Sequence, residues 1–184
     1  MSAKLASLAA LGASAGGAGA FGIYKLTNGN SNLQKLTEEE YQLVFKEFKS
    51  QTPFITALKT KTPTIESTSD NTDGGKAVKA WCVGNDSSDA KQWCIPLPKT
   101  IREKIKKALT TKWDEKIKSI KSTDTNDLLK DLQTIKSDLT QVSESDQKAK
   151  DALKGWCESK LDTRLINSDG DAIYTKVESR CLEG

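Results

Sequence analysis

The sequence AVKAWC at residues 77–82 returns as ALKGWC at residues 152–157, and the two segments differ only by one Val/Leu and one Ala/Gly exchange. Each copy is followed by one further cysteine, Cys94 after the first copy and Cys181 after the second. Residues three and four positions apart share one face of a helix, so each copy predicts a helix that turns its tryptophan and its cysteine toward a core. The similarity indicates a helical domain built from two diverged units.

We place these units at about residues 37–98 and 99–184, within one helical domain over residues 37–184. Four cysteines allow three disulfide pairings, and two diverged units select one of them because each unit would close its own loop. The predicted pairs are Cys82–Cys94 and Cys157–Cys181. A zinc site would need all four thiolates at irregular spacing, because the chain has no histidine. Disulfides are therefore predicted, free buried thiols are the alternative, and no metal site is expected.

Length and composition limit the class of protein. The chain has 184 residues, of which 36% are hydrophobic and 29% charged, and this suits one compact domain with an appendage. The absence of histidine removes every His-dependent catalytic triad and every imidazole acid–base pair. Because no other nucleophile–base set stands out, we expect no enzyme, no catalytic residue and no cofactor.

The charge balance bears on possible partners. The net charge is +3, and without Lys4 and Lys25, which flank the apolar N-terminal segment, 26 basic residues face 25 acidic ones. A domain that binds nucleic acid carries a clear basic excess. Nucleic acid is therefore not an expected partner.

Residues 5–24 form an apolar run of 20 residues without a charge. As a helix rising about 1.5 Å per residue, this run would span roughly 30 Å, the thickness of a bilayer core. Three interpretations stay open for residues 1–25: an uncleaved single-pass membrane anchor, a cleaved signal peptide with A-x-A-like sites, and a soluble Ala/Gly-rich leader. We favour the anchor, followed by a polar tether over residues 26–36. The cysteines favour a C-terminal domain that lies outside the cell.

Apolar residues at helical spacing dominate the domain and no run alternates with period two, so the predicted fold class is mainly α. Thr37 and Glu40 have the spacing of a capping box, which predicts a helix from that point to about Thr52-Pro53. Further helices are predicted over about 76–82, 99–121, 125–142 and 145–161. The remaining stretches are predicted as loops (59–75 and 86–89), an extended segment (92–98), a turn (167–171), and either helix or extended chain (172–181).

Two short motifs resemble ligand sites and fail in detail. Gly74-Gly75-Lys76-Ala77 lacks both the Ser/Thr and the leading glycine of a phosphate loop, so a loop-to-helix junction is predicted instead. Asn167–Asp171 resembles part of a calcium loop, but Leu165 and Lys176 would fill its first and twelfth positions, so a turn is predicted. Glu38, Glu39 and Glu40 are explained as first-turn carboxylates that favour a helix N-terminus.

Residues 99–121 contain nine basic and three acidic residues, whereas residues 123–151 contain four basic and seven acidic ones. One interpretation is two neighbouring helices with complementary, mostly solvated faces. The other is a basic patch that binds an anionic surface such as host glycans or lipid head groups. The candidate residues for that patch are Lys104, Lys106, Lys107, Lys112 and Lys116.

Several features occur together along the chain: the Ala/Gly-rich leader, LTEEEYQLVFK at 36–46, the paired Trp-Cys dipeptides, WCIP at 93–96 with TIRE at 100–103, and the late Cys181. This combination resembles the lineage-expanded paralogous families of uncharacterised proteins in haemotropic mycoplasmas. The resemblance implies a membrane-associated product of a wall-less parasite of red cells, with surface display and antigenic variation. In a cell without a periplasm, an exported domain would lie directly at the host interface.

Together these features predict a membrane-anchored, surface-exposed protein that acts as an antigenic or host-interface scaffold. Its expected partners are the membrane, through residues 5–24, and a host-cell surface or antibody. The alternative is an adhesion module that binds an anionic host surface through residues 99–121.

Overall fold

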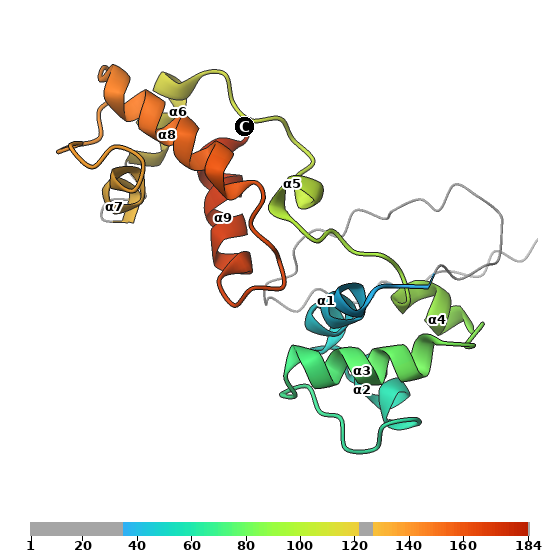
Figure 1. Ribbon diagram of the computed structural model, residues 1–184. Helices are drawn as coiled ribbons and strands as arrows, with labels where there is room; N and C mark the ends of the chain where they lie inside the picture. The colour runs from blue at the N-terminus through green and yellow to red at the C-terminus, as the bar shows by residue number, and fades with distance from the viewer. Residues whose placement is uncertain (1–34, 122–126, 184) are drawn as a thin grey trace, which may run out of the picture. The chain divides into compact units, whose positions relative to one another are not determined.

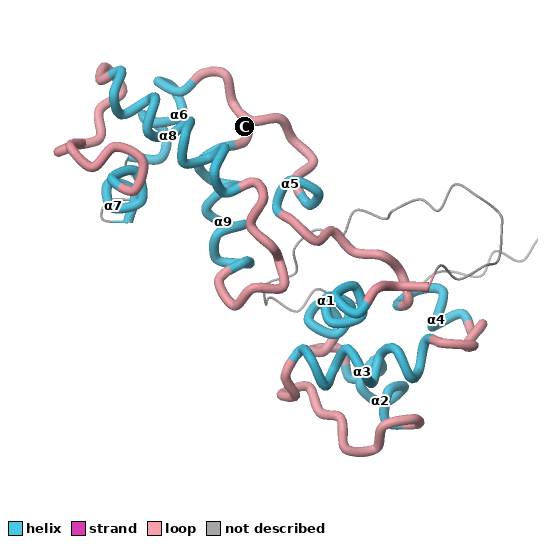
Figure 2. The backbone as a smooth tube through the Cα atoms, viewed as in Figure 1, coloured by secondary structure: helices cyan, strands magenta, loops and turns pink. Residues whose placement is uncertain are grey.

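The computed structural model describes residues 35–121 and 127–183, and these residues fold into nine helices without a β-strand (Figures 1 and 2). The only strand-like pairings in this part of the chain are two isolated bridges, Thr100–Arg164 and Leu109–Leu182. The predicted mainly α fold is therefore confirmed for the described residues. The helices are α1 Glu38–Phe48, α2 Thr52–Lys59, α3 Asn71–Cys82, α4 Ser88–Trp93, α5 Ile101–Lys104, α6 Trp113–Lys121, α7 Asp127–Gln133, α8 Gln147–Lys160 and α9 Gly170–Cys181.

The start of α1 follows directly from its sequence. The Thr37 hydroxyl accepts a hydrogen bond from the Glu40 backbone N–H, and the Glu40 carboxylate accepts from the Thr37 backbone N–H over 2.7 Å. The predicted capping box is thus present and satisfies two backbone donors at the helix start. The helix ends at Phe48, and α2 begins with Thr52 and Pro53, because proline is tolerated in a first helical turn. Helix α2 was not predicted from the sequence.

The crossing of α1 and α3 depends on two glycines. A Cβ atom at Gly74 would lie 2.0 Å from the Phe45 ring, and one at Gly75 would lie 2.6 Å from the Gln42 side chain. The backbone of α3 can therefore approach α1 only because both positions lack a side chain. The glycines belong to the first turns of α3, so that helix begins earlier than the predicted residue 76.

The buried apolar residues form two clusters. The first cluster takes its members from α1 to α4 and includes Phe45, Phe54, Trp81 and Trp93. The second takes its members from α5 to α9, together with Leu43 of α1. Leu97 packs against both clusters, so the change from one cluster to the other comes near residue 98 in the sequence.

The prediction of one continuous helix over residues 99–121 is wrong. α5 has four residues, Ile105 to Lys112 are not helical, and α6 begins at Trp113. Backbone groups of this stretch bond to distant segments instead: the Thr110 N–H donates to Cys181 O over 2.8 Å, and Ala108 O accepts from the Glu183 N–H over 3.1 Å. These tertiary hydrogen bonds replace the i to i−4 bonds that a helix would need.

The predicted helix over residues 125–142 is also too long, because α7 ends at Gln133. The Gln133 side-chain amide donates to Leu139 O over 2.9 Å and closes a compact turn. That turn buries Leu139, whereas Ile135 is 37% exposed.

The C-terminal region agrees better with its prediction. α8 lies within the expected residues 145–161, and α9 resolves the choice between helix and extended chain for residues 172–181 in favour of helix. The turn expected at 167–171 leads into α9. By contrast, residues 88–93 form the short helix α4, part of which was expected to be extended.

The anchor, signal or leader assigned to residues 1–25 lies outside the described residues, as does most of the tether. Within residues 35–121 and 127–183, no helix is both long enough and apolar enough to cross a membrane.

Candidate functional site

All four cysteines of the chain are paired as the repeat predicts, Cys82 with Cys94 and Cys157 with Cys181. Each disulfide joins the last part of one helix to the end of the next: α3 to α4, and α8 to α9. The two AxxxWC copies therefore occupy equivalent places in two disulfide-closed helix–turn–helix elements.

The tryptophans beside the cysteines lie in the core, as expected. The Trp81 and Trp93 rings have centroids 5.8 Å apart, and Trp93 meets Phe54 edge to face at 5.2 Å. Trp156 is almost fully buried, with the Arg180 guanidinium over its ring at 5.2 Å. Aromatic contacts of this kind add about 0.5–1.5 kcal/mol each beyond the burial of their area.

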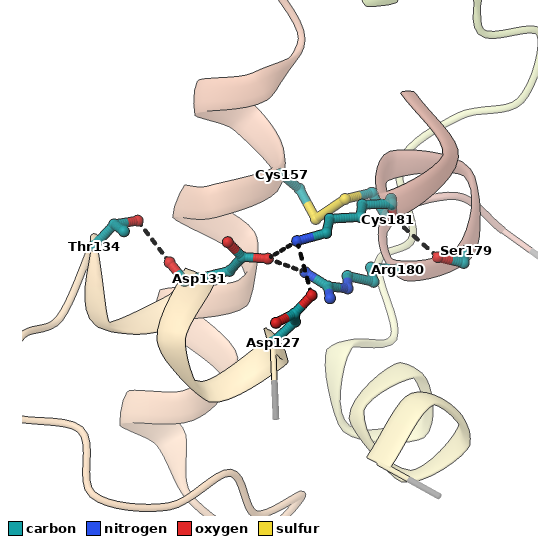
Figure 3. A network of polar contacts seen from close by, with 8 residues as sticks. Asp127, Asp131, Thr134, Cys157, Ser179, Arg180 and Cys181 are labelled. Atoms are coloured by element: carbon teal, nitrogen blue, oxygen red, sulfur yellow. Dashed lines mark hydrogen bonds and ion pairs between the residues drawn. A yellow bond between two sulfur atoms is a disulfide. The ribbon is translucent and has the colours of Figure 1, made fainter. Parts of the chain in front are cut away.

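The second disulfide lies beside a network of charges (Figure 3). Asp131 of α7 accepts hydrogen bonds at Oδ2 from Lys176 Nζ over 2.7 Å and from Arg180 over 2.6 Å, both of α9. Asp127 adds a longer contact of 3.6 Å to Lys176. Burial alone would raise the pKa of Asp131, but the hydrogen bonds and charges of Lys176 and Arg180 outweigh it and hold that pKa below its ordinary value.

This network is a connection between α7 and α9. The Arg180 side chain is only 2% exposed, and contacts with Asp127 and Asp131 engage both Lys176 and Arg180. This network was not predicted from the sequence. The available signal was spacing: both the acids and the cations stand four residues apart, each pair on one helix face.

The five candidate lysines of the basic stretch do not share one helix face. Lys104 ends α5, Lys106, Lys107 and Lys112 lie in the connection to α6, and Lys116 lies in α6. Lys104 is already engaged, because its Nζ lies 4.3 Å from the centre of the Tyr174 ring.

The other four candidate lysines are exposed or only partly buried. Lys112 forms an exposed ion pair of 3.4 Å with Glu115, and Lys106 and Lys107 are exposed. Burial and the nearby charge of Lys107 lower the pKa of Lys116, so positive charges do gather here. Lys112 and Lys116 also line a shallow depression together with Thr110, Thr111 and Ser119, but Glu115 and Glu183 line it too.

The three glutamates of the first turn of α1 each meet a different cation. Glu38 pairs with Lys79, Glu39 with Arg164, and Glu40 with Lys99 over 3.1 Å. Favourable interaction with the helix N-terminus is thus only part of their role, because they also tie α1 to three other segments.

The two rejected motifs have structural roles in the fold. Gly74 and Gly75 lie inside α3, and Lys76 pairs with Asp73 over 2.9 Å. Asp171 of the calcium-like segment pairs with Lys46 over 2.8 Å. Over the residues that the structure describes, no group of three or more acidic or cysteine side chains is arranged to hold a metal ion.

A small cavity opens beside the first disulfide. Its volume is about 260 Å³, and its lining includes both cysteines of that bond, Tyr41, Gly84 and Lys35. Burial raises the pKa of Tyr41, so its hydroxyl stays protonated.

Comparisons with protein-family models, with curated proteins and with solved structures find no match to this chain.

Proposed function

We propose that this chain is a surface-exposed, membrane-anchored scaffold whose helical domain folds outside the cell. The observation that carries the proposal is that every cysteine of the chain is used in a disulfide. Disulfides form and persist in oxidising environments and are rare where the cytosol keeps thiols reduced. The paired cysteines therefore support an exported domain, with the apolar residues 5–24 as its anchor.

The distribution of burial supports a scaffold that displays variable loops. The connection between α2 and α3, residues 60–70, is mostly exposed and is held to the core by Ile65, which is 3% exposed. The turn around Gly84 between α3 and α4 is exposed as well. Substitutions in such loops cost little stability, so the exposed surface can vary while the disulfide-closed core persists. This is the property required of an antigenic or host-interface domain.

Antibody accessibility on cells tests this proposal. An antiserum raised against the folded domain should label intact, unpermeabilised cells that express the full chain. An antibody to a cytosolic protein serves as the control and should label only permeabilised cells. Labelling of this chain only after permeabilisation would contradict the proposal.

A second candidate function is adhesion to an anionic host surface. The observation that favours it is that Lys107 lies close enough to Lys116 for its charge to add to the larger effect of burial, and both lower the pKa of Lys116. Lys106 and Lys107 are exposed, and they are the members of the group best placed to meet a sulfated glycan.

Binding to immobilised heparin tests adhesion. The variant Lys106→Glu/Lys107→Glu should lose binding, whereas the matched control Lys61→Glu/Lys91→Glu reverses two exposed lysines outside the basic stretch and should retain it. Binding that is insensitive to salt, or equal loss in both variants, would exclude a specific role for residues 99–121.

A further inference from the structure

The two disulfides differ in their access to solvent. Cys82 and Cys94 are 5% and 6% exposed, and both line the cavity of about 260 Å³. Cys157 and Cys181 are fully buried, beside Trp156 and the network of Asp131 and Arg180. One water needs only about 15 Å³ of such volume, so the cavity beside Cys82–Cys94 has room for a small organic molecule.

We propose that Cys82–Cys94 is a thiol–disulfide exchange site for small thiols, and that Cys157–Cys181 is a closed structural bond. Exchange requires a thiolate to reach a disulfide sulfur. In the folded protein the cavity gives such access to Cys82 and Cys94. The buried pair becomes reachable only when the surrounding helices open.

The charges around the cavity favour an anionic reagent. Lys35 lies at its lining, and no carboxylate occurs among the described residues that line it. Tyr41, with its raised pKa, contributes a neutral hydroxyl and not a phenolate. At the lining itself a thiolate therefore meets one positive charge and no carboxylate, whereas the charges of Glu38 and Glu40 act on the neighbouring Tyr41.

The exchange balances with two equivalents of a small thiol. The first thiolate attacks the Sγ atom of Cys82 or Cys94, the S–S bond breaks, and the other cysteine leaves as a thiolate that takes a proton from solvent. A second thiolate attacks the reagent's sulfur in the mixed disulfide, and the remaining cysteine leaves as a thiolate. Two electrons pass from the small thiols to the cystine, and the small thiols become their own disulfide.

The cluster of apolar residues from α1 to α4 contains contacts that do not depend on the disulfide. Trp81 belongs to α3 and Trp93 to α4, and the contact of their rings joins the two helices without the sulfur bridge. Trp93 also packs against Phe54 of α2. Reduction should therefore loosen the α3–α4 element without unfolding the domain.

The decisive experiment follows the reduction of each cysteine in the native, full-length protein. The protein is exposed to graded dithiothreitol, quenched with acid, alkylated, and mapped by peptide mass spectrometry. We expect the Cys82–Cys94 bond to be reduced at least tenfold faster than the Cys157–Cys181 bond, as measured by the fraction of each cysteine that is alkylated. Equal rates for the two pairs, or faster reduction of Cys157–Cys181, would overturn the proposal.

Two controls distinguish access from local chemistry. In concentrated urea both pairs should be reduced at similar rates, and persistence of the tenfold difference there would contradict a cavity-based explanation. With glutathione as the reagent, Lys35→Glu should slow reduction of Cys82–Cys94 by roughly threefold at low ionic strength. The matched variant Lys61→Glu changes an exposed lysine away from the cavity and should leave the rate unchanged. Equal slowing in both variants would remove the assigned role of Lys35.

Discussion

Arg180 and Asp131 join α9 to α7 through a hydrogen bond of 2.6 Å, although the arginine side chain is 2% exposed and the aspartate 25%. Burial of an ion is expensive unless a partner and hydrogen bonds compensate it. Asp131 supplies that compensation and also accepts from Lys176. The aspartate is therefore the residue on which this charge network depends.

Asp131→Asn should destabilise the domain, because it removes the carboxylate charge that accepts hydrogen bonds from both Arg180 and Lys176. Removing one member of a buried pair costs about 3–5 kcal/mol, and the partial exposure of Asp131 reduces our expectation to roughly 2 kcal/mol. Urea unfolding measures the loss. The control Asp127→Asn removes a contact of 3.6 Å from an exposed carboxylate and should cost far less. Equal losses in the two variants would show that Asp131 has no special role.

The network also predicts a pH dependence of stability. The folded-state pKa of Asp131 lies below its ordinary value of 3.8, so between the two values the unfolded state binds more protons. The contribution of Asp131 is therefore complete above about pH 5 and is lost as the pH falls through the folded-state pKa. The free energy of unfolding should fall more steeply in wild type than in Asp131→Asn on acidification from neutral pH toward pH 3. Parallel curves would contradict the assigned pKa shift.

Each disulfide should contribute measurably to stability. The closed loops span 12 and 24 residues, and the chain-entropy model gives about 3 kcal/mol for the first and roughly 3.5 kcal/mol for the second. Cys157→Ala/Cys181→Ala should therefore be the more damaging pair, since it also leaves a cavity in a fully buried region. Melting temperatures of the two double variants test the order. A larger loss for Cys82→Ala/Cys94→Ala would reverse our assignment of the structural bond.

Two glycine substitutions, one at the contact between α1 and α3 and one in α8, form a matched pair of predictions. Gly74→Ala should destabilise the domain by about 2 kcal/mol or more, because the new methyl group would overlap the Phe45 ring. Gly155→Ala places its methyl group 3.0 Å from the side chain of the partly exposed Ile135, which can shift. It should be neutral or stabilise by up to about 1 kcal/mol through helix propensity. Thermal unfolding separates these outcomes, and a tolerated Gly74→Ala would contradict the close packing of α1 on α3.

The residues that the sequence predicts well are those whose interactions are local or repeated. Thr37 and Glu40 lie three positions apart and form their capping box from that spacing alone. The disulfide pairing follows from two similar segments, each with its own later cysteine. Trp81 and Trp156 are buried because helical spacing places them on the same face as the neighbouring cysteines.

The predictions that failed concern segments governed by distant partners. Residues 99–121 have helical spacing, but backbone bonds to Cys181 and Glu183 interrupt the helix between α5 and α6. The same interruption separates the lysines that were expected to share one face. Asp131 and Arg180 are 49 positions apart, so their pairing depends on the packing of α7 beside α9. Local patterns carry no information about such contacts.

The central claim is that the domain is oxidised and lies outside the cell, and it is tested most directly in cells that express the full chain. Added protease should digest the domain on intact cells, and an alkylating probe applied on denaturing lysis should find no free thiol until a reductant is added. Protection from protease in intact cells, together with four cysteines that react without reduction, would contradict the account.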